Sequence, residues 1–107
     1  SGGKAEVVND RIMVPVSEFC DAVGLEVMLE NTSGVAVIKN GSDVIYILEN
    51  DSRIMVNKVK KDAYLSPYMK DSSLMVSARC LSELSGYDIE WNQEQNTLYL
   101  TKKEVEE

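Results

Sequence analysis

The chain contains no histidine, and its 11 lysines and arginines are outnumbered by 18 aspartates and glutamates. Without imidazole it has no Ser/His/Asp or Cys/His catalytic arrangement and no histidine-ligated zinc or copper site. The formal net charge of −7 argues against the clustered cations that displace counterions from a nucleic-acid backbone. We therefore expect no nucleic acid among the partners and no metal or other cofactor.

Long apolar runs are also missing. None approaches the ~20 residues that cross a bilayer, and the chain does not begin with the charged-then-apolar pattern of a signal peptide. We expect no transmembrane segment in this chain. Because Ser1-Gly2-Gly3 resembles a cloning scar ahead of an excised domain, we expect any signal or anchor to lie outside this piece. The length of 107 residues fits one compact domain.

A weak internal repeat appears when the chain is shifted against itself by 62 positions, the shift that brings Val76 onto Val14. Apolar positions and both helix-ending glycines stay in phase: Ile12-Met13-Val14 lies over Leu74-Met75-Val76, Phe19 over Leu81, Gly24 over Gly86, Val27 over Ile89, and Val37-Ile38 over Tyr99-Leu100. The repeat predicts two tandem copies of one unit, at about residues 9–39 and 71–101.

Each copy has the pattern of a strand, a helix and a hairpin. In the first copy, Ile12 to Val14 is β-prone, Pro15 suits the first turn of a helix, and the helix ends at Gly24. Residues 25–29 and 35–39 then form strands, and residues 88–91 and 97–101 do so in the second copy. Between the copies, residues 43–49 and 53–56 are further strands, and the charged residues 60–62 form a solvated edge.

These patterns predict an α+β fold with antiparallel β-sheets and two short helices, because the connections are too short for parallel crossovers. The domain should span residues 7–102, with a flexible start at 1–6 and a flexible tail at 103–107. The expected core contains the following apolar residues: Val14, Phe19, Val23, Val27, Ile38, Ile45, Ile47, Val76, Leu81, Leu84, Ile89 and Leu100.

The segment Asn9-Asp10-Arg11-Ile12-Met13-Val14-Pro15-Val16, its helix and its hairpin resemble the copper amine oxidase N-terminal-like domain, also called a stalk domain. The second copy matches through Met75-Val76 and Asp88-Ile89-Glu90-Trp91-Asn92. Two positions depart from the family pattern: Ser17 replaces a frequent arginine, which Arg79 supplies in the second copy, and Ser77 replaces the helix-starting proline. The resemblance implies a noncatalytic module of secreted or cell-surface proteins of Gram-positive bacteria, found beside wall hydrolases, proteases or other enzymes.

The family name suggests copper and quinone chemistry, and the residues argue against both. The copper site of a true amine oxidase resembles a three-histidine cage beside a tyrosine in an Asn-Tyr-Asp/Glu motif. Here Tyr87-Asp88 follows Gly86 instead of asparagine, and histidine is lacking. We expect neither a copper site nor a quinone cofactor.

Cys20 and Cys80 are 60 positions apart, with no Cys-x-x-Cys spacing, and they are not equivalent in the repeat. Both lie on apolar helix faces, so buried free thiols are the favoured interpretation and a disulfide is the alternative. The oxygen-rich loop 49–52 lacks the ligand spacing of a calcium loop and is interpreted as a solvated turn. We expect no catalytic residues.

Among the aromatic residues, Trp91 and Tyr99 are expected to pack in the core. Tyr64 and Tyr68 flank Ser66-Pro67 in a less periodic segment and are the candidate exposed contacts. The favoured function is a noncatalytic interaction or stalk module that spaces, docks or anchors a partner domain.

The alternative is an accessory domain that binds a cell-wall polymer or glycan, for which Tyr64, Tyr68 and Trp91 would need to face solvent together. A hydrolase using paired carboxylates is disfavoured, because no nucleophile or base constellation is recognisable. The expected partners are therefore protein domains or cell-wall components, and the sequence sets no oligomeric state.

Overall fold

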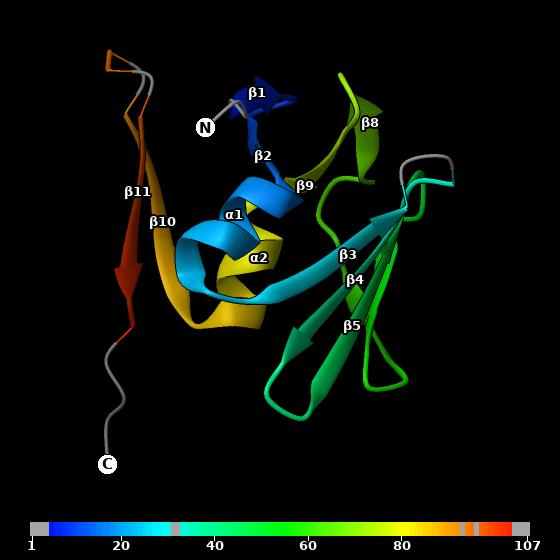
Figure 1. The fold of residues 1–107 in the computed structure, drawn as a ribbon. Coiled ribbons are helices and arrows are strands. Elements are labelled where there is room, and N and C mark those ends of the chain that lie inside the picture. The colour runs from blue at the N-terminus through cyan, green and yellow to red at the C-terminus, as the bar shows by residue number, and fades with distance from the viewer. Residues whose placement is uncertain (1–4, 31–32, 93, 96, 104–107) are drawn as a thin grey trace.

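A computed structural model describes residues 5–30, 33–92, 94–95 and 97–103 (Figure 1). The described elements are β1 (Glu6–Val8), β2 (Arg11–Pro15), α1 (Val16–Val23), β3 (Glu26–Glu30), β4 (Val35–Asn40), β5 (Asp43–Leu48), β6 (Arg53–Val56), β7 (Val59–Asp62), β8 (Tyr68–Lys70), β9 (Ser73–Ser77), α2 (Ala78–Ser85), β10 (Tyr87–Asn92) and β11 (Thr97–Lys102). Every strand pairing in this part of the chain is antiparallel. The predicted α+β class is confirmed.

The strands form three sheets around the two helices. A four-stranded sheet has the order β1-β2-β9-β8, a five-stranded sheet runs β3-β4-β5-β6-β7, and β10 and β11 form a separate hairpin. Figure 1 shows both helices in the centre, with the five-stranded sheet on one side and the β10–β11 hairpin on the other. The helices therefore supply the surfaces on which the five-stranded sheet and the β10–β11 hairpin pack, through contacts of α1 with β3 and of α2 with β10.

The bounds of the elements repeat along the chain. Moving β1, β2, α1 and β4 forward by 62 positions gives the bounds of β8, β9, α2 and β11, and β10 begins one residue before the projected start of β3. The two halves meet where β2 pairs with β9. There Val14 lies opposite Val76, Met13 opposite Ser77 and Pro15 opposite Met75. This register is unchanged when the halves are exchanged, as in a contact across a local two-fold axis.

Both helices end as predicted, at glycines in the left-handed conformation. Gly24 has φ 77° and donates its N–H to the carbonyl of Cys20, while Gly86 has φ 79° and donates to Ser82. The start of α1 differs from the prediction, because Pro15 is the N-cap and not part of the first turn. Its ψ of 123° is extended, since Pro15 still belongs to β2 and pairs with β9.

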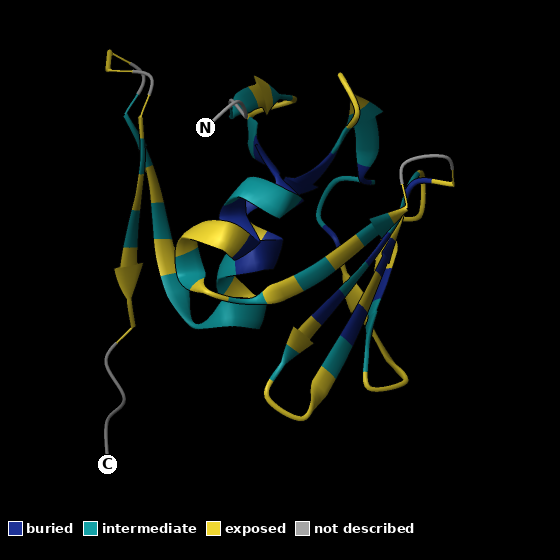
Figure 2. Cartoon of the chain, viewed as in Figure 1, coloured by how far each residue is buried: buried dark blue, intermediate teal, exposed yellow. Residues whose placement is uncertain are grey.

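The core lies where the helices meet the sheets (Figure 2). Of the expected core residues, seven are buried: Val14, Phe19, Ile38, Ile45, Ile47, Val76 and Leu81. The other five are partly buried and pack against that cluster: Val23, Val27, Leu84, Ile89 and Leu100. The predicted apolar periodicity is therefore confirmed at the centre of the core. On the second hairpin, Ile89 and Leu100 face the core but are only partly buried.

Two predictions about single side chains have different outcomes. Tyr99 is 45% exposed, so its expected place in the core is wrong. Leu98 and Leu100 pack against the core, and strand alternation turns Tyr99 to the opposite face. Trp91 is partly buried. Cys20 and Cys80 are buried free thiols, as favoured.

The predicted flexible ends lie largely outside the described residues, which begin at Ala5 and stop at Lys103. Within them, Glu6 is the first residue of β1, and Lys103 donates its backbone N–H to the carbonyl of Gly86 at 2.8 Å. Neither helix in the described ranges is long and apolar enough to cross a membrane.

Candidate functional site

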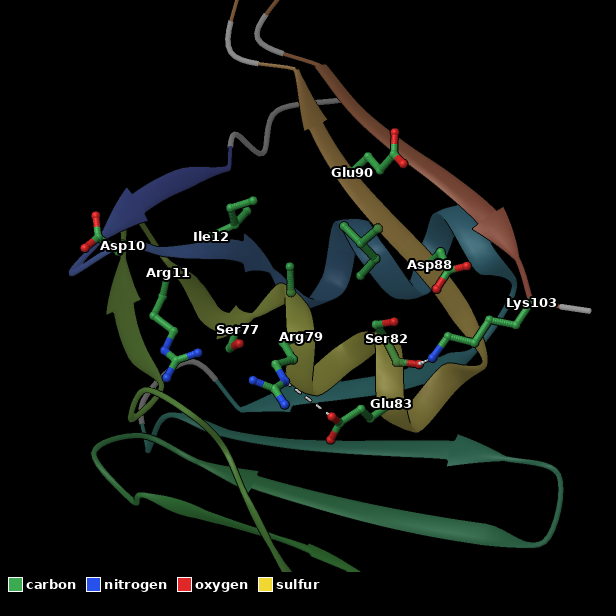
Figure 3. Close-up of a pocket in the computed structure, with 12 residues that line it drawn as sticks. Asp10, Arg11, Ile12, Ser77, Arg79, Ser82, Glu83, Asp88, Glu90 and Lys103 are labelled. Atoms are coloured by element: carbon green, nitrogen blue, oxygen red, sulfur yellow. Dashed lines mark hydrogen bonds and ion pairs between the residues drawn. The ribbon is translucent and has the colours of Figure 1, made fainter.

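A cavity of about 520 Å³ opens between the start of β2, the first turns of α2 and β10 (Figure 3). Nine of the twelve residues that line it are polar or charged. The charged residues around it are Asp10, Arg11, Arg79, Glu83, Asp88, Glu90 and Lys103. Cations and carboxylates therefore both surround one opening, which suits recognition of a partner that carries charges of both signs.

Tyr64 lies beside the cavity and contacts two of the arginines that line it. The guanidinium carbon of Arg79 lies 4.4 Å from the centroid of the Tyr64 ring, and that of Arg11 lies 5.5 Å away. These distances permit cation–π attraction from both arginines. The Tyr64 hydroxyl donates to the carboxylate of Glu83 at 2.7 Å, and this hydrogen bond raises the pKa of Tyr64. We call Arg11, Tyr64, Arg79 and Glu83 the arginine–tyrosine cluster.

The helix start sets the position of two members of this cluster. The Ser77 hydroxyl caps α2 by accepting the N–H of Cys80 at 3.4 Å. Arg79 and Glu83 then lie one turn apart on the exposed face, where Arg79 Nε and Glu83 Oε2 are 3.4 Å apart. At the positions 62 residues earlier than Arg79 and Glu83 the chain carries Ser17 and Asp21, so only the second helix presents this pair.

Tyr64 itself is held by its own loop. Its backbone has φ 70°, and its N–H donates to Asp62 Oδ1 at 2.8 Å. A left-handed conformation at an aromatic residue costs free energy, and such positions persist only where the surroundings impose them. The left-handed backbone at Tyr64 thus holds its ring within cation–π distance of both guanidinium groups.

The hydroxyl groups that line the cavity serve the fold. Ser77 caps α2, and the Ser82 hydroxyl donates to the carbonyl of Tyr87. Among the residues that the structure describes, no side chain that could act as a base is hydrogen-bonded to either serine hydroxyl, as a nucleophile would require. The arrangement can hold charged groups in place, and it offers no recognisable means of activating a nucleophile.

The donor set does not suit copper. The chain has no histidine, and the thiols of Cys20 and Cys80 are buried, with burial raising their pKa values to about 11 and about 12. Copper binding to a thiol requires the thiolate, which these environments disfavour. The described part of the chain also contains no cluster of three or more His, Cys, Asp or Glu side chains arranged to hold a metal.

The structure separates the two predicted contact residues. Tyr64 belongs to the arginine–tyrosine cluster, whereas Tyr68 lies on β8 and donates its hydroxyl to Glu6 on β1. Glu6 also pairs with Lys70, and the hydrogen bonds from Lys70 and Tyr68 lower the pKa of Glu6. Both tyrosines and Trp91 are partly buried, so none of the three side chains is fully open to solvent. Their role as contacts stays a prediction.

Sequence reasoning did not identify the arginines as site residues. The three side chains come from separate parts of the chain: Arg11 from β2, Tyr64 from the loop between β7 and β8, and Arg79 from α2. No local sequence pattern joins them. One signal was present, namely the four-residue spacing of Arg79 and Glu83 on a helix. The replacement of Arg79 by Ser17 in the other copy also marked this face as different.

The comparisons with known proteins agree with the resemblance seen in the sequence. The family model described as the copper amine oxidase N-terminal domain matches residues 3–100. Searches among characterised proteins and among solved structures gave no significant match.

Proposed function

Because the chain belongs to the copper amine oxidase N-terminal domain family, we propose that it is an interaction module that spaces, docks or anchors a partner domain. The family suggests a noncatalytic accessory module, which is compatible with no catalysis in this chain. The observation that carries the docking role is the arginine–tyrosine cluster. The cluster holds the guanidinium groups of Arg11 and Arg79 against Tyr64 at the edge of the cavity. The serine hydroxyls that line the cavity are hydrogen-bonded within the fold instead.

The chemistry of the cluster indicates what it would contact. The Arg79 and Glu83 side chains are 62% and 51% exposed, so both remain available to a partner. A guanidinium with free N–H groups forms paired hydrogen bonds with a carboxylate, and stacking on Tyr64 reduces the freedom that Arg79 would lose on binding. A partner domain that presents a carboxylate next to a basic group would match Arg79 and Glu83 together.

A change at Arg79 tests this role. We would measure by calorimetry the binding of the chain to the folded domain that its own gene encodes beside it, with Arg79→Ala and the control Arg53→Ala. Arg53 is an exposed arginine on β6 outside the cavity lining. We expect Arg79→Ala to weaken binding by about tenfold and Arg53→Ala to leave it unchanged.

Three results would contradict the docking role. One is a gene that encodes no other folded domain, and another is equal binding by both variants. The third is sedimentation of the chain with purified peptidoglycan that Arg79→Ala leaves unaffected, which would favour the alternative, a wall-polymer or glycan-binding accessory domain.

The location outside the cell belongs to the same proposal. We propose a secreted or surface-anchored parent protein of a Gram-positive bacterium, with the signal or anchor outside this piece. Its support is the family resemblance. Intact source cells would be treated with a protease and then probed with an antibody to this chain. We expect the protease to abolish the antibody staining. Retention of the protein after shaving, and its release only on lysis, would contradict the location.

The origin of the fold as two tandem copies is also a proposal. It is supported by the shared element bounds and by the hairpin registers. The β3–β4 and β10–β11 hairpins have the same register after a shift of 62 residues. In the first hairpin Glu26 lies opposite Lys39, and in the second Asp88 lies opposite Thr101. In a crystal structure, residues 9–39 should superpose on residues 71–101 through both helices and hairpins. Helices that align while the hairpins diverge would contradict it.

A further inference from the structure

The outer edge of β11 has no strand beside it in the described part of the chain. In the first half, β4 lies between β3 and β5 and is hydrogen-bonded on both edges. In the second half, β10 and β11 reproduce the β3–β4 pair in the same register, and the sheet stops there. The position that β5 occupies against β4 is thus open against β11.

Burial differs between the two hairpins in the way that a missing strand would cause. On β4, the inward residues Ala36 and Ile38 are 0% and 1% exposed. Their counterparts on β11, Leu98 and Leu100, are only partly buried. Figure 2 shows buried positions on β4 and β5 of the five-stranded sheet and none on β10 or β11. A strand added to β11 would cover apolar surface that water now reaches.

The chemistry of this edge also differs from that of the other outer strands. Natural proteins protect free edges with charged side chains. Glu26 and Glu30 guard β3, and Lys60 and Lys61 guard β7. Residues 97–101 of β11 carry neither an acidic nor a basic side chain, and Tyr99 is exposed. Apart from Lys102 at its end, β11 therefore lacks the charged side chains that usually protect a free edge against strand addition.

We propose that the edge of β11 binds an extended segment of a partner protein as an added antiparallel strand. The β4–β5 pair supplies the expected pattern. There Ile47 lies opposite Ala36, Ile45 opposite Ile38 and Asp43 opposite Asn40. The segment that fits β11 therefore carries branched apolar residues opposite Leu98 and Leu100 and an acidic residue opposite Lys102.

A partner segment fits this edge better than a second copy of the chain. Two copies bring together net charges of −7 each, and an edge of six residues supplies little of the ~800 Å² per partner that a stable dimer buries. An extended peptide needs only the backbone hydrogen bonds and alternate side-chain contacts, as in other cases of strand addition. The proposal rests on the role of the domain as an interaction module, and it adds a second contact on the β10–β11 hairpin, whose β10 strand lines the cavity.

The probe is a synthetic peptide with the sequence of residues 42–52, which contains β5 and three acidic side chains. It would be titrated into the ¹⁵N-labelled chain at about 150 mM salt. We expect chemical-shift changes centred on residues 97–102, slower exchange of β11 amides and a Kd of about 10 µM to 1 mM. The control peptide carries N-methyl groups on alternate backbone nitrogens and should not bind.

Two charge reversals test the register. Lys102→Glu should weaken binding of the peptide roughly two- to fivefold, because an exposed ion pair contributes modestly. Lys60→Glu, on the exposed strand β7, is the matched control and should leave the affinity unchanged.

Several outcomes would overturn the proposal. These are shifts outside β11, equal binding of the N-methylated peptide, or a dimer formed through β11 in sedimentation experiments without peptide. Arg79→Ala should not affect binding of this peptide. If the peptide fails to bind while Arg79→Ala still weakens docking of the neighbouring domain, the edge proposal falls and the proposed function stands. If the peptide binds and the neighbouring domain does not, the edge proposal stands and the proposed function falls.

Discussion

Replacing Gly34 with alanine should destabilise the domain more than the same change at either helix-ending glycine. Gly34 is buried with φ 64°, and a Cβ there would lie 2.7 Å from Glu49 Cβ and 2.5 Å from Glu49 Oε1. The carboxylate can rotate away, but Glu49 Cβ is fixed by the backbone, since the Glu49 N–H donates to the Gly34 carbonyl at 2.8 Å. At Gly24 and Gly86 an added Cβ meets nothing within 4 Å.

The magnitudes follow from two separate costs. The left-handed conformation costs an alanine about 1–2 kcal/mol, which is the whole expected effect of Gly24→Ala or Gly86→Ala. At Gly34 the overlap adds about 1–3 kcal/mol, for a total of about 2–5 kcal/mol. That is a large share of the ~5–15 kcal/mol typical of a domain.

Urea denaturation followed by circular dichroism would measure the three free energies of unfolding. Adding Glu49→Gly to Gly34→Ala should remove the overlap cost and leave the conformational cost, as a double-mutant cycle would show. Equal losses at all three glycines, or no coupling between positions 34 and 49, would refute the reasoning.

Two further predictions concern pH. Burial raises the pKa of Cys20 to about 11 and that of Cys80 to about 12, so the folded chain holds these protons where unfolded thiols have lost them. Stability from this source should be complete below about pH 9 and fall as the pH rises through 11 towards 12, and thiol reagents should react at pH 8 only on unfolding; rapid labelling of the folded chain would contradict this. Glu6 has a lowered pKa because Lys70 and Tyr68 hydrogen-bond to it, so its contribution is present above its usual pKa of 4.5 and lost as the pH falls. Because Lys70 is exposed, Glu6→Gln should cost at most about 1 kcal/mol at pH 7 in urea denaturation, and a larger loss would mean that β1 and β8 depend on this contact.

The helices and strands were predictable because their determinants are local. Gly24 and Gly86 end helices through their own backbone freedom, and the alternation of apolar residues set which face of each strand packs inward. Tyr99 shows the limit of that reasoning. Its strand was predicted correctly, yet an aromatic residue was expected in the core although its neighbours Leu98 and Leu100 already faced inward.

The sequence by itself therefore determined both helices, most strands but neither β1 nor β8, the 62-residue spacing of the shared elements and the lack of imidazole chemistry. The tertiary structure decided that β2 pairs with β9, that Arg11, Tyr64 and Arg79 meet beside one cavity, and that β11 keeps an open edge. These are relations between residues far apart in the chain. They depend on how strands pair and helices pack after loop closure, and neither backbone propensity nor hydrophobic period carries that information.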